Sequence, residues 1–184
     1  MTWQKDALIH AKNQEPKEAV GLVLNVRGKL KYYPCNNLAI TDHQCFILDP
    51  EDYVKADNIG NIVGIFHSHP VNPPTPSQAD KVSCEASGLP WYIVNPTSKE
   101  WSYLEPCGYE PPLLGRQWVW GVTDCWSLVR DWYKENKNIN LKDWDRPLTP
   151  QEFNDNPLFE QCANDTNFRE LDSNEKLENG DVLL

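Results

Sequence analysis

Residues 62–70 of this 184-residue chain read IVGIFHSHP. The first five positions form a continuous run of branched and aromatic residues around one glycine, which predicts a strand buried on both faces. Pro70 opens a loop in which positions 73, 74 and 76 are also proline, and the sheet must stop there because proline cannot donate a ladder hydrogen bond. The stretch therefore predicts a core strand that carries His67 and His69 at its end.

Helices and strands alternate on both sides of this strand. Apolar residues at helical spacing predict a helix over about residues 2–14, and a hairpin is expected from strands at 20–26 and 30–33. The other expected elements are a short strand at 45–48, a helix at 50–58, a helix at 77–87, and strands at 91–94 and 100–104. This alternation predicts one α/β or α+β domain over residues 1–105.

A second module is expected after a linker at residues 106–114, which begins with an aperiodic stretch of proline, glycine and cysteine. The net charge also changes, from -3 over residues 1–105 to -7 over the rest of the chain. In the module, residues 115–184, Thr123 or Asp124 can cap a helix that runs to about Asn136. Residues 137–179 show weak periodicity, and residues 180–184 suggest a turn that enters a strand.

Composition limits the classes of function. With 17 basic and 27 acidic residues the net charge is -10, so the basic footprint of a nucleic-acid-binding protein is missing. No apolar run approaches the roughly 20 residues that span a bilayer, and no secretory signal is expected at the start. We therefore predict a cytoplasmic protein with neither nucleic acid nor membrane as a partner. The six cysteines include no C-x-x-C pair, which argues against a zinc ribbon and a disulfide framework.

The two histidines at the strand end indicate a metal site. Side chains at i and i+2 of a strand point to the same side, so His67 and His69 can face one point. The loop that follows leads into a helix whose first turn contains Asp80. Two histidines and one carboxylate leave one tetrahedral position free, as in catalytic zinc sites. The alternative is an incidental His-x-His pair next to a purely structural capping box formed by Ser77 and Asp80.

The pattern His67-x-His69, ten residues and then Asp80, with Pro70 and Ser77 between them, resembles the JAMM (MPN-plus) metallopeptidase family. The resemblance covers about residues 1–105 and implies a mixed sheet flanked by helices. It also implies that His67, His69 and Asp80 bind Zn²⁺.

The same resemblance gives roles to two further residues. Ser77 helps to hold the attacking water or the tetrahedral oxyanion, and Glu18 is the general base. The residues alone leave alternatives open: Glu18 could be a solvated glutamate beside Lys17, Glu15 competes for the role of base, and Ser77 could serve only as a helix cap.

Cys125 lies at the predicted start of a helix, where unsatisfied N–H groups and the helix dipole favour a thiolate. The alternative is burial of this thiol among the neighbouring tryptophans. Residues 121–129 (GVTDCWSLV) and 180–184 (GDVLL) resemble the nucleophile segment and the Gly-Asp turn of NlpC-type cysteine peptidases, a papain-like α+β family that cleaves cell-wall peptides. All four histidines lie at position 69 or earlier, so the second module is expected to be a partial domain without a catalytic base of its own.

The combination of the two domains resembles the K-type tail tip proteins of lambda-like bacteriophages. This resemblance implies a role in tail assembly, other tail tip proteins as partners, and a location in the host cytoplasm during assembly or in the virion tail tip. Our leading hypothesis is a zinc-dependent peptidase or isopeptidase acting on a peptide or protein, with peptidoglycan peptides as one substrate class. The alternatives are a non-catalytic assembly protein with a structural zinc, and a peptidoglycan endopeptidase that uses Cys125 in a longer chain.

Overall fold

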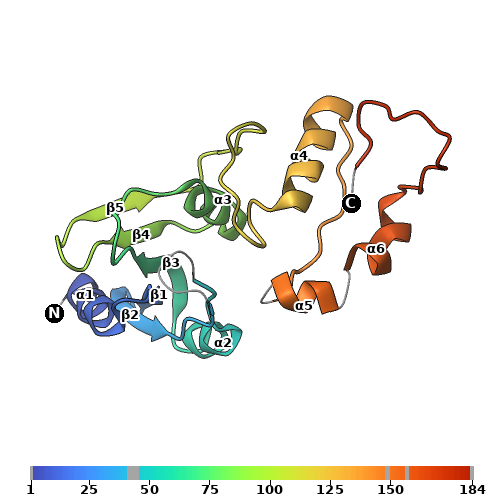
Figure 1. Ribbon diagram of the computed structural model, residues 1–184. Coiled ribbons are helices and arrows are strands. Elements are labelled where there is room, and N and C mark those ends of the chain that lie inside the picture. The colour runs from blue at the N-terminus through green and yellow to red at the C-terminus, as the bar shows by residue number, and fades with distance from the viewer. Residues whose placement is uncertain (1, 41–45, 148–149, 156–157, 183–184) are drawn as a thin grey trace. The chain divides into compact units, whose positions relative to one another are not determined.

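The computed structural model describes residues 2–40, 46–147, 150–155 and 158–182. The chain divides into two units, Met1–Glu110 and Pro111–Leu184, each considered separately below (Figure 1). Among the described residues, no helix is both long and apolar enough to cross a bilayer.

The first unit is built on a five-stranded sheet in the order β2-β1-β3-β4-β5. The strands are β1 (Val20–Val26), β2 (Lys29–Cys35), β3 (Asn61–Ser68), β4 (Trp91–Val94) and β5 (Trp101–Leu104). β3 runs parallel to β4, whereas the other neighbouring strands are antiparallel. This architecture confirms the predicted mixed sheet flanked by helices, with the IVGIF run in its central strand.

Helices cover both faces of this sheet (Figure 1). α1 (Trp3–Gln14) packs its buried residues against Val23, Phe66 and Val94. On the other face, one residue each from α2 (Pro50–Asp57) and α3 (Gln78–Ser87) packs into a cluster with Leu22 and Ile65. Neighbouring residues of a strand point to opposite faces of the sheet. β3 therefore contributes Ile65 to one core and Phe66 to the other, and its sequence shows no polar alternation.

The loop between β2 and α2 differs from the predicted short strand at 45–48. Leu48 forms an isolated bridge with Asn37, and Phe46 and Ile47 have no strand structure. Cys45 lies outside the described residues. The pairing is this short because Asn37 itself occupies the backbone N–H groups of Ala39 and Ile47, which closes a tight loop in place of a ladder.

The regular elements described in the second unit are all helices, α4 (Cys125–Lys137), α5 (Pro150–Asp155) and α6 (Leu158–Thr166), and the described segments between and after them are irregular. The sequence predicted α4 but neither of the two shorter helices. Aromatic rings form its interior: Trp126 contacts Trp144 and Phe168, and Tyr133 also contacts Phe168. A turn is present at Gly180, but Asp181 and Val182 are not in a strand; the last two residues of the expected strand lie outside the described residues.

A matched pair of leucines tests the packing of the sheet. Leu22 is fully buried in β1, whereas Leu30 in β2 is 51% exposed. Leu22→Ala should lower the free energy of unfolding by about 2–5 kcal/mol because it leaves a cavity, and Leu30→Ala should change it by less than about 0.5 kcal/mol. Urea unfolding of the full chain measures both values. Equal losses in the two variants would contradict the described core.

Candidate functional site

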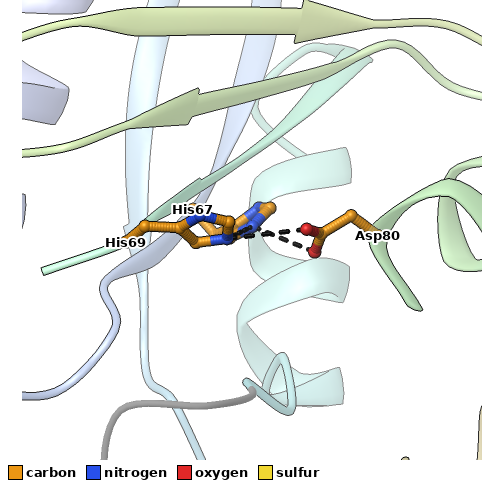
Figure 2. A group of neighbouring side chains, drawn as sticks. All are labelled: His67, His69 and Asp80. Atoms are coloured by element: carbon orange, nitrogen blue, oxygen red, sulfur yellow. Dashed lines mark hydrogen bonds and ion pairs between the residues drawn. The ribbon is translucent and has the colours of Figure 1, made fainter. Parts of the chain in front are cut away.

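His67, His69 and Asp80 converge at the end of β3 (Figure 2). The two histidines are separated by one strand residue and so face the same side. Asp80 is the third residue of α3, and its carboxylate points toward both rings. The Nε2 atoms of the histidines are 3.1 Å apart; Oδ1 of Asp80 lies 3.2 Å from His67 Nε2, and Oδ2 of Asp80 lies 3.5 Å from His69 Nε2.

These distances provide a test of whether the residues fit a zinc ion. Ligand atoms placed about 2.0–2.1 Å from a tetrahedral zinc ion are separated from one another by about 3.3–3.4 Å. The distance of 3.1 Å between the two Nε2 atoms, and the distances of 3.2 and 3.5 Å from each of them to one Asp80 oxygen, lie close to that value. Two neutral imidazoles and one carboxylate also match the donor set of catalytic zinc sites. The residues therefore fit zinc in both spacing and chemistry.

The second nitrogen of each histidine has a different environment. His69 Nδ1 lies 3.0 Å from the carbonyl oxygen of Pro73, so that nitrogen can donate and leave Nε2 free as a ligand. His67 Nδ1 is buried and has no hydrogen-bond partner among the described residues. The loop after β3 therefore orients one ring by a hydrogen bond, and packing orients the other.

Electrostatics within the cluster favour a deprotonated His67 and an ionised Asp80. Burial lowers the pKa of His67 and outweighs the hydrogen bond that the ring donates to Asp80, which raises it. Burial also opposes ionisation of Asp80, but hydrogen bonds from both histidines outweigh it and hold the pKa of Asp80 well below its usual range. For His69, burial lowers the pKa, whereas Asp80 and the Pro73 carbonyl raise it, and the net direction is upward.

Glu18 lies at the entrance to β1 and is only 5% exposed. Burial is the main cause that raises the pKa of Glu18 to about 8, while the charges of His69 and Asp80 act on it in opposite directions. The alternative of a solvated glutamate is therefore wrong. Glu15, the competing carboxylate, is exposed and lies 3.4 Å from the Thr97 hydroxyl.

Hydrogen bonds with β3 fix the position of the Glu18 segment. In the antiparallel register of β1 and β3, Val20 is opposite His67. The Ser68 N–H donates to the Ala19 carbonyl over 3.0 Å, and the Ala19 N–H donates to the Ser68 hydroxyl over 2.8 Å. Two hydrogen bonds therefore join Ala19, the residue after Glu18, to Ser68, the residue between the two histidines.

Ser77 is the N-cap of α3. Its hydroxyl accepts from the Asp80 N–H over 3.1 Å, and the Asp80 carboxylate accepts from the Ser77 N–H over 2.7 Å. The two residues form a complete capping box. The capping interpretation of Ser77 is confirmed, whereas its role toward an oxyanion stays a prediction.

Sequence reasoning did not single out the residues that surround the cluster. Phe46 and Trp91 place their rings 4.9 and 5.4 Å from the ring of His67 and make one side of the site apolar. Ser68 and Asn95 are buried and bond to backbone next to the site. The position of Ser68 between the two histidines could have indicated a residue at the site. Asn95, which directly precedes Pro96, indicated only a turn.

Cys125 in the second unit is the first residue of α4 and is exposed. The alternative, burial of this thiol among the tryptophans, is therefore wrong. Asp124 caps the helix by accepting from the Ser127 N–H over 2.9 Å. A thiol at this position faces solvent beside the first turn of a capped helix.

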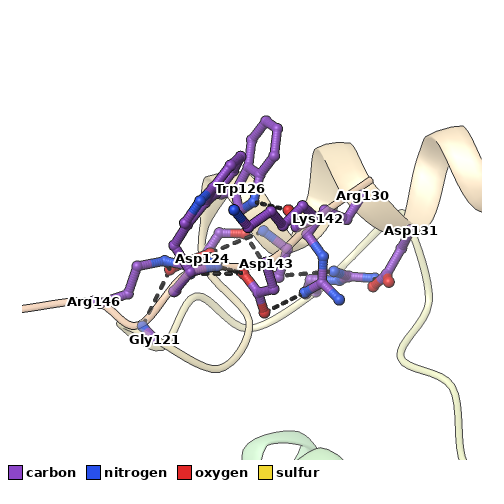
Figure 3. A network of polar contacts seen from close by, with 11 residues as sticks. Gly121, Asp124, Trp126, Arg130, Asp131, Lys142, Asp143 and Arg146 are labelled. Carbon is purple, nitrogen blue, oxygen red and sulfur yellow. Dashed lines mark hydrogen bonds and ion pairs between the residues drawn. The ribbon is translucent and has the colours of Figure 1, made fainter. Parts of the chain in front are cut away.

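A buried ion pair supports this helix start (Figure 3). The side chain of Asp124 is fully buried and that of Arg146 is 8% exposed, with Nε of Arg146 2.9 Å from Oδ2 of Asp124. The same Oδ2 accepts from the Gly121 N–H over 3.2 Å. Arg146 also pairs with Asp143, which in turn pairs with Arg130. The segment at 143–146 is thereby tied to the turn before Cys125.

Comparison with known families agrees with the geometry of the first unit. The family model described as prokaryotic homologs of the JAB domain matches residues 3–104. The chain belongs to the prokaryotic JAB family. The matched range contains the whole sheet of the first unit together with His67, His69 and Asp80.

Relatives of this JAB-family chain include two phage proteins. The tail tip assembly protein K of Escherichia phage N15 is 36% identical over 182 residues, which cover 97% of this chain and 73% of that protein. The tail tip assembly protein K of Escherichia phage lambda is 39% identical over 86 residues, which cover 47% of this chain and 41% of that protein. A desampylase of Haloferax volcanii is 29% identical over 104 residues, 50% of this chain and 75% of the desampylase.

Two solved structures are similar to part of the chain. A solution structure of a Desulfitobacterium hafniense protein has 28% sequence identity and a TM-score of 0.45, with 55% of this chain and 76% of that chain covered. The crystal structure of a JAB1/MPN domain protein from Archaeoglobus fulgidus has 21% identity and a TM-score of 0.39, with 61% of this chain and 95% of that chain covered.

The buried ion pair in the second unit leads to a stability prediction. Arg146→Met removes the partner of a fully buried carboxylate and should destabilise the unit by about 3–5 kcal/mol, because an uncompensated charge remains inside. Arg169→Met, which removes an exposed pair with Glu175, is the matched control and should leave the melting temperature nearly unchanged. Thermal unfolding followed by tryptophan fluorescence compares them. Equal melting temperatures for both variants would refute the structural role of the Asp124–Arg146 pair.

Proposed function

We propose that the first unit is a zinc-dependent hydrolase that cleaves peptide or isopeptide amide bonds, with His67, His69 and Asp80 holding the ion. The observation that carries this proposal is the convergence of two histidine Nε2 atoms and the Asp80 carboxylate at separations that suit ligands of tetrahedral zinc. Membership of the JAB family and the relationship to a desampylase support hydrolysis of an amide bond.

A zinc ion bound by these residues supplies Lewis-acid chemistry, which polarises an amide carbonyl and lowers the pKa of water. Glu18 takes a proton from the attacking water and delivers it to the leaving nitrogen. A carboxyl group with a pKa of about 8 suits both steps because it can accept and release a proton near neutral pH. The position of Glu18 beside the histidine-bearing strand supports this role.

The remaining residues of the site stabilise the transition state and exclude water. The Ser77 hydroxyl, held at the start of α3 by the capping box, donates to an oxyanion that develops on the amide carbonyl. The rings of Phe46 and Trp91 keep water away from one side of His67. A less solvated site strengthens each of these polar interactions.

We infer that this hydrolase acts in phage tail tip assembly, because two relatives carry the name tail tip assembly protein K. Its partners in that setting are other phage tail tip proteins, and a peptide or protein is its substrate. The host cytoplasm is the place of action during assembly. A non-catalytic assembly protein with a structural zinc is the alternative proposal.

We infer further that residues 115–184 form part of an NlpC-type cysteine peptidase domain with Cys125 as its nucleophile. The exposure of Cys125 at the capped start of α4 supports this assignment. A cysteine nucleophile needs a base, but no histidine follows His69 in this sequence. Peptidoglycan cleavage through Cys125 therefore requires a histidine from outside this sequence.

Metal content tests the assignment of the ligands. Protein purified without added metal should contain about one zinc per chain, and a His67→Ala, His69→Ala double variant should contain none. His10→Ala is a suitable control because His10 lies against Tyr32 and not in the cluster. Elemental mass spectrometry measures the zinc. A wild-type protein that carries no zinc and takes up none on titration would refute the metallohydrolase proposal.

Substitution of the proposed base tests the catalytic role. Glu18→Gln should keep zinc bound but slow hydrolysis by about 10²- to 10⁴-fold, the usual contribution of a general base. The exposed Glu15→Gln variant should retain the wild-type rate. The probes are quenched fluorescent peptides, joined either linearly or through lysine side-chain amides. Undiminished cleavage by Glu18→Gln would show that another group is the base, and zinc binding without cleavage of any probe would favour the assembly alternative.

A further inference from the structure

The side chain of Asn95 connects two loops next to the metal cluster. Asn95 follows β4 directly and is 8% exposed. Its Nδ2 amide donates to the carbonyl oxygens of His69 over 3.0 Å and Asn72 over 2.9 Å. Its Oδ1 accepts from the backbone N–H groups of Thr97 and Ser98 over 3.0 and 2.8 Å. The turn between β4 and β5 is thereby joined to the loop that follows β3.

Asparagine is suited to this position by its hydrogen-bonding capacity. Its amide has two N–H donors and one oxygen with two lone pairs, and all four are used here. Aspartate has the same shape but no donor when ionised, so it would place a carboxylate oxygen against two carbonyl oxygens. A buried polar network with every member bonded fixes one arrangement of the chain.

Hydrogen bonds hold both backbone polar groups of His69, and Asn95 makes one of them. The His69 N–H donates to the Val94 carbonyl over 2.9 Å, and the His69 carbonyl accepts from Asn95. Asn95 also fixes the carbonyl of Asn72, the residue before Pro73, whose own carbonyl lies 3.0 Å from His69 Nδ1. One buried amide therefore bonds both the carbonyl of His69 and the residue before the group that orients its ring.

We propose that Asn95 is a positioning residue for the metal site, holding the His69 ring and the Pro73 carbonyl in the arrangement that binds zinc. This inference rests on the zinc hydrolase proposed above. The role is indirect, because Asn95 touches the backbone of a ligand and the loop that orients it. Loss of partners outside the ligands themselves typically weakens metal binding by about 10- to 100-fold.

Asn37 offers a matched control in the same unit. Its Oδ1 also accepts from two backbone N–H groups, those of Ala39 and Ile47, and its Nδ2 donates to the Glu18 carbonyl over 3.0 Å. It contacts none of the three metal ligands in these bonds. Asn37→Asp therefore makes the same chemical change and adds the same charge as Asn95→Asp, but next to the backbone of Glu18, which is not one of the three metal ligands.

The test measures the zinc dissociation constant of the full chain by competition with a chromogenic chelator. Asn95→Asp should weaken zinc binding by about 10- to 100-fold, whereas Asn37→Asp should stay within about twofold of wild type. The visible absorption of the cobalt-loaded protein gives a second readout, because it reports ligand geometry at the ion. It should change in Asn95→Asp and not in Asn37→Asp.

Each outcome decides between the alternatives. Equal zinc affinities for Asn95→Asp and wild type, or equal losses in both aspartate variants, would overturn the role of Asn95 while leaving the zinc hydrolase intact. If wild type binds no zinc, the proposed function fails, and this inference fails with it. If Asn95→Asp does not fold, Asn95→Ser replaces it, since a serine hydroxyl can cap the turn but is too short to reach His69. A folded Asn95→Ser with wild-type affinity and cobalt spectrum would also overturn the inference.

Discussion

The antiparallel pairing of β1 with β3 is the constraint on which the site depends. It places Val20 opposite His67 and lets Ser68 bond twice to Ala19, once through its backbone and once through its hydroxyl. A shift by one residue would turn every side chain of β1 to the other face of the sheet. The register that packs the two cores thus also brings Glu18 to the strand that carries the histidines.

In both units a carboxylate at a helix start lies beside a candidate functional residue. Asp80 caps α3 together with Ser77 while it faces two imidazoles, and Asp124 caps α4 directly before Cys125. Buried carboxylates are costly unless they are hydrogen-bonded or paired. Here each carboxylate is hydrogen-bonded by helix N–H groups and paired with a second group, imidazoles for Asp80 and Arg146 for Asp124. The start of each helix is thereby coupled to the position of the neighbouring candidate residue.

The sequence predicted the sheet strands, the three helices of the first unit and α4 because each has a clear periodicity or a cap. It did not predict α5 and α6, which begin at Pro150 and Leu158, since their polar residues give little signal in isolation. The short strand expected at 45–48 was also not found, because the Asn37 side chain competes for the backbone there. Aromatic contacts of the second unit, such as Trp126 with Phe168, join residues far apart in the chain.

By itself, the sequence determined that two histidines lie at the end of a buried strand and that Asp80 lies in the first turn of a helix, because strand and helix periods are local properties. Only the tertiary structure decided that the two histidine Nε2 atoms lie 3.1 Å apart, with one Asp80 oxygen 3.2 Å from His67 and the other 3.5 Å from His69. It also decided that Glu18 rather than Glu15 is buried beside them, and that Asn95 holds the loop after His69. Burial and long-range hydrogen bonds depend on how distant segments pack, and local sequence patterns do not specify that packing.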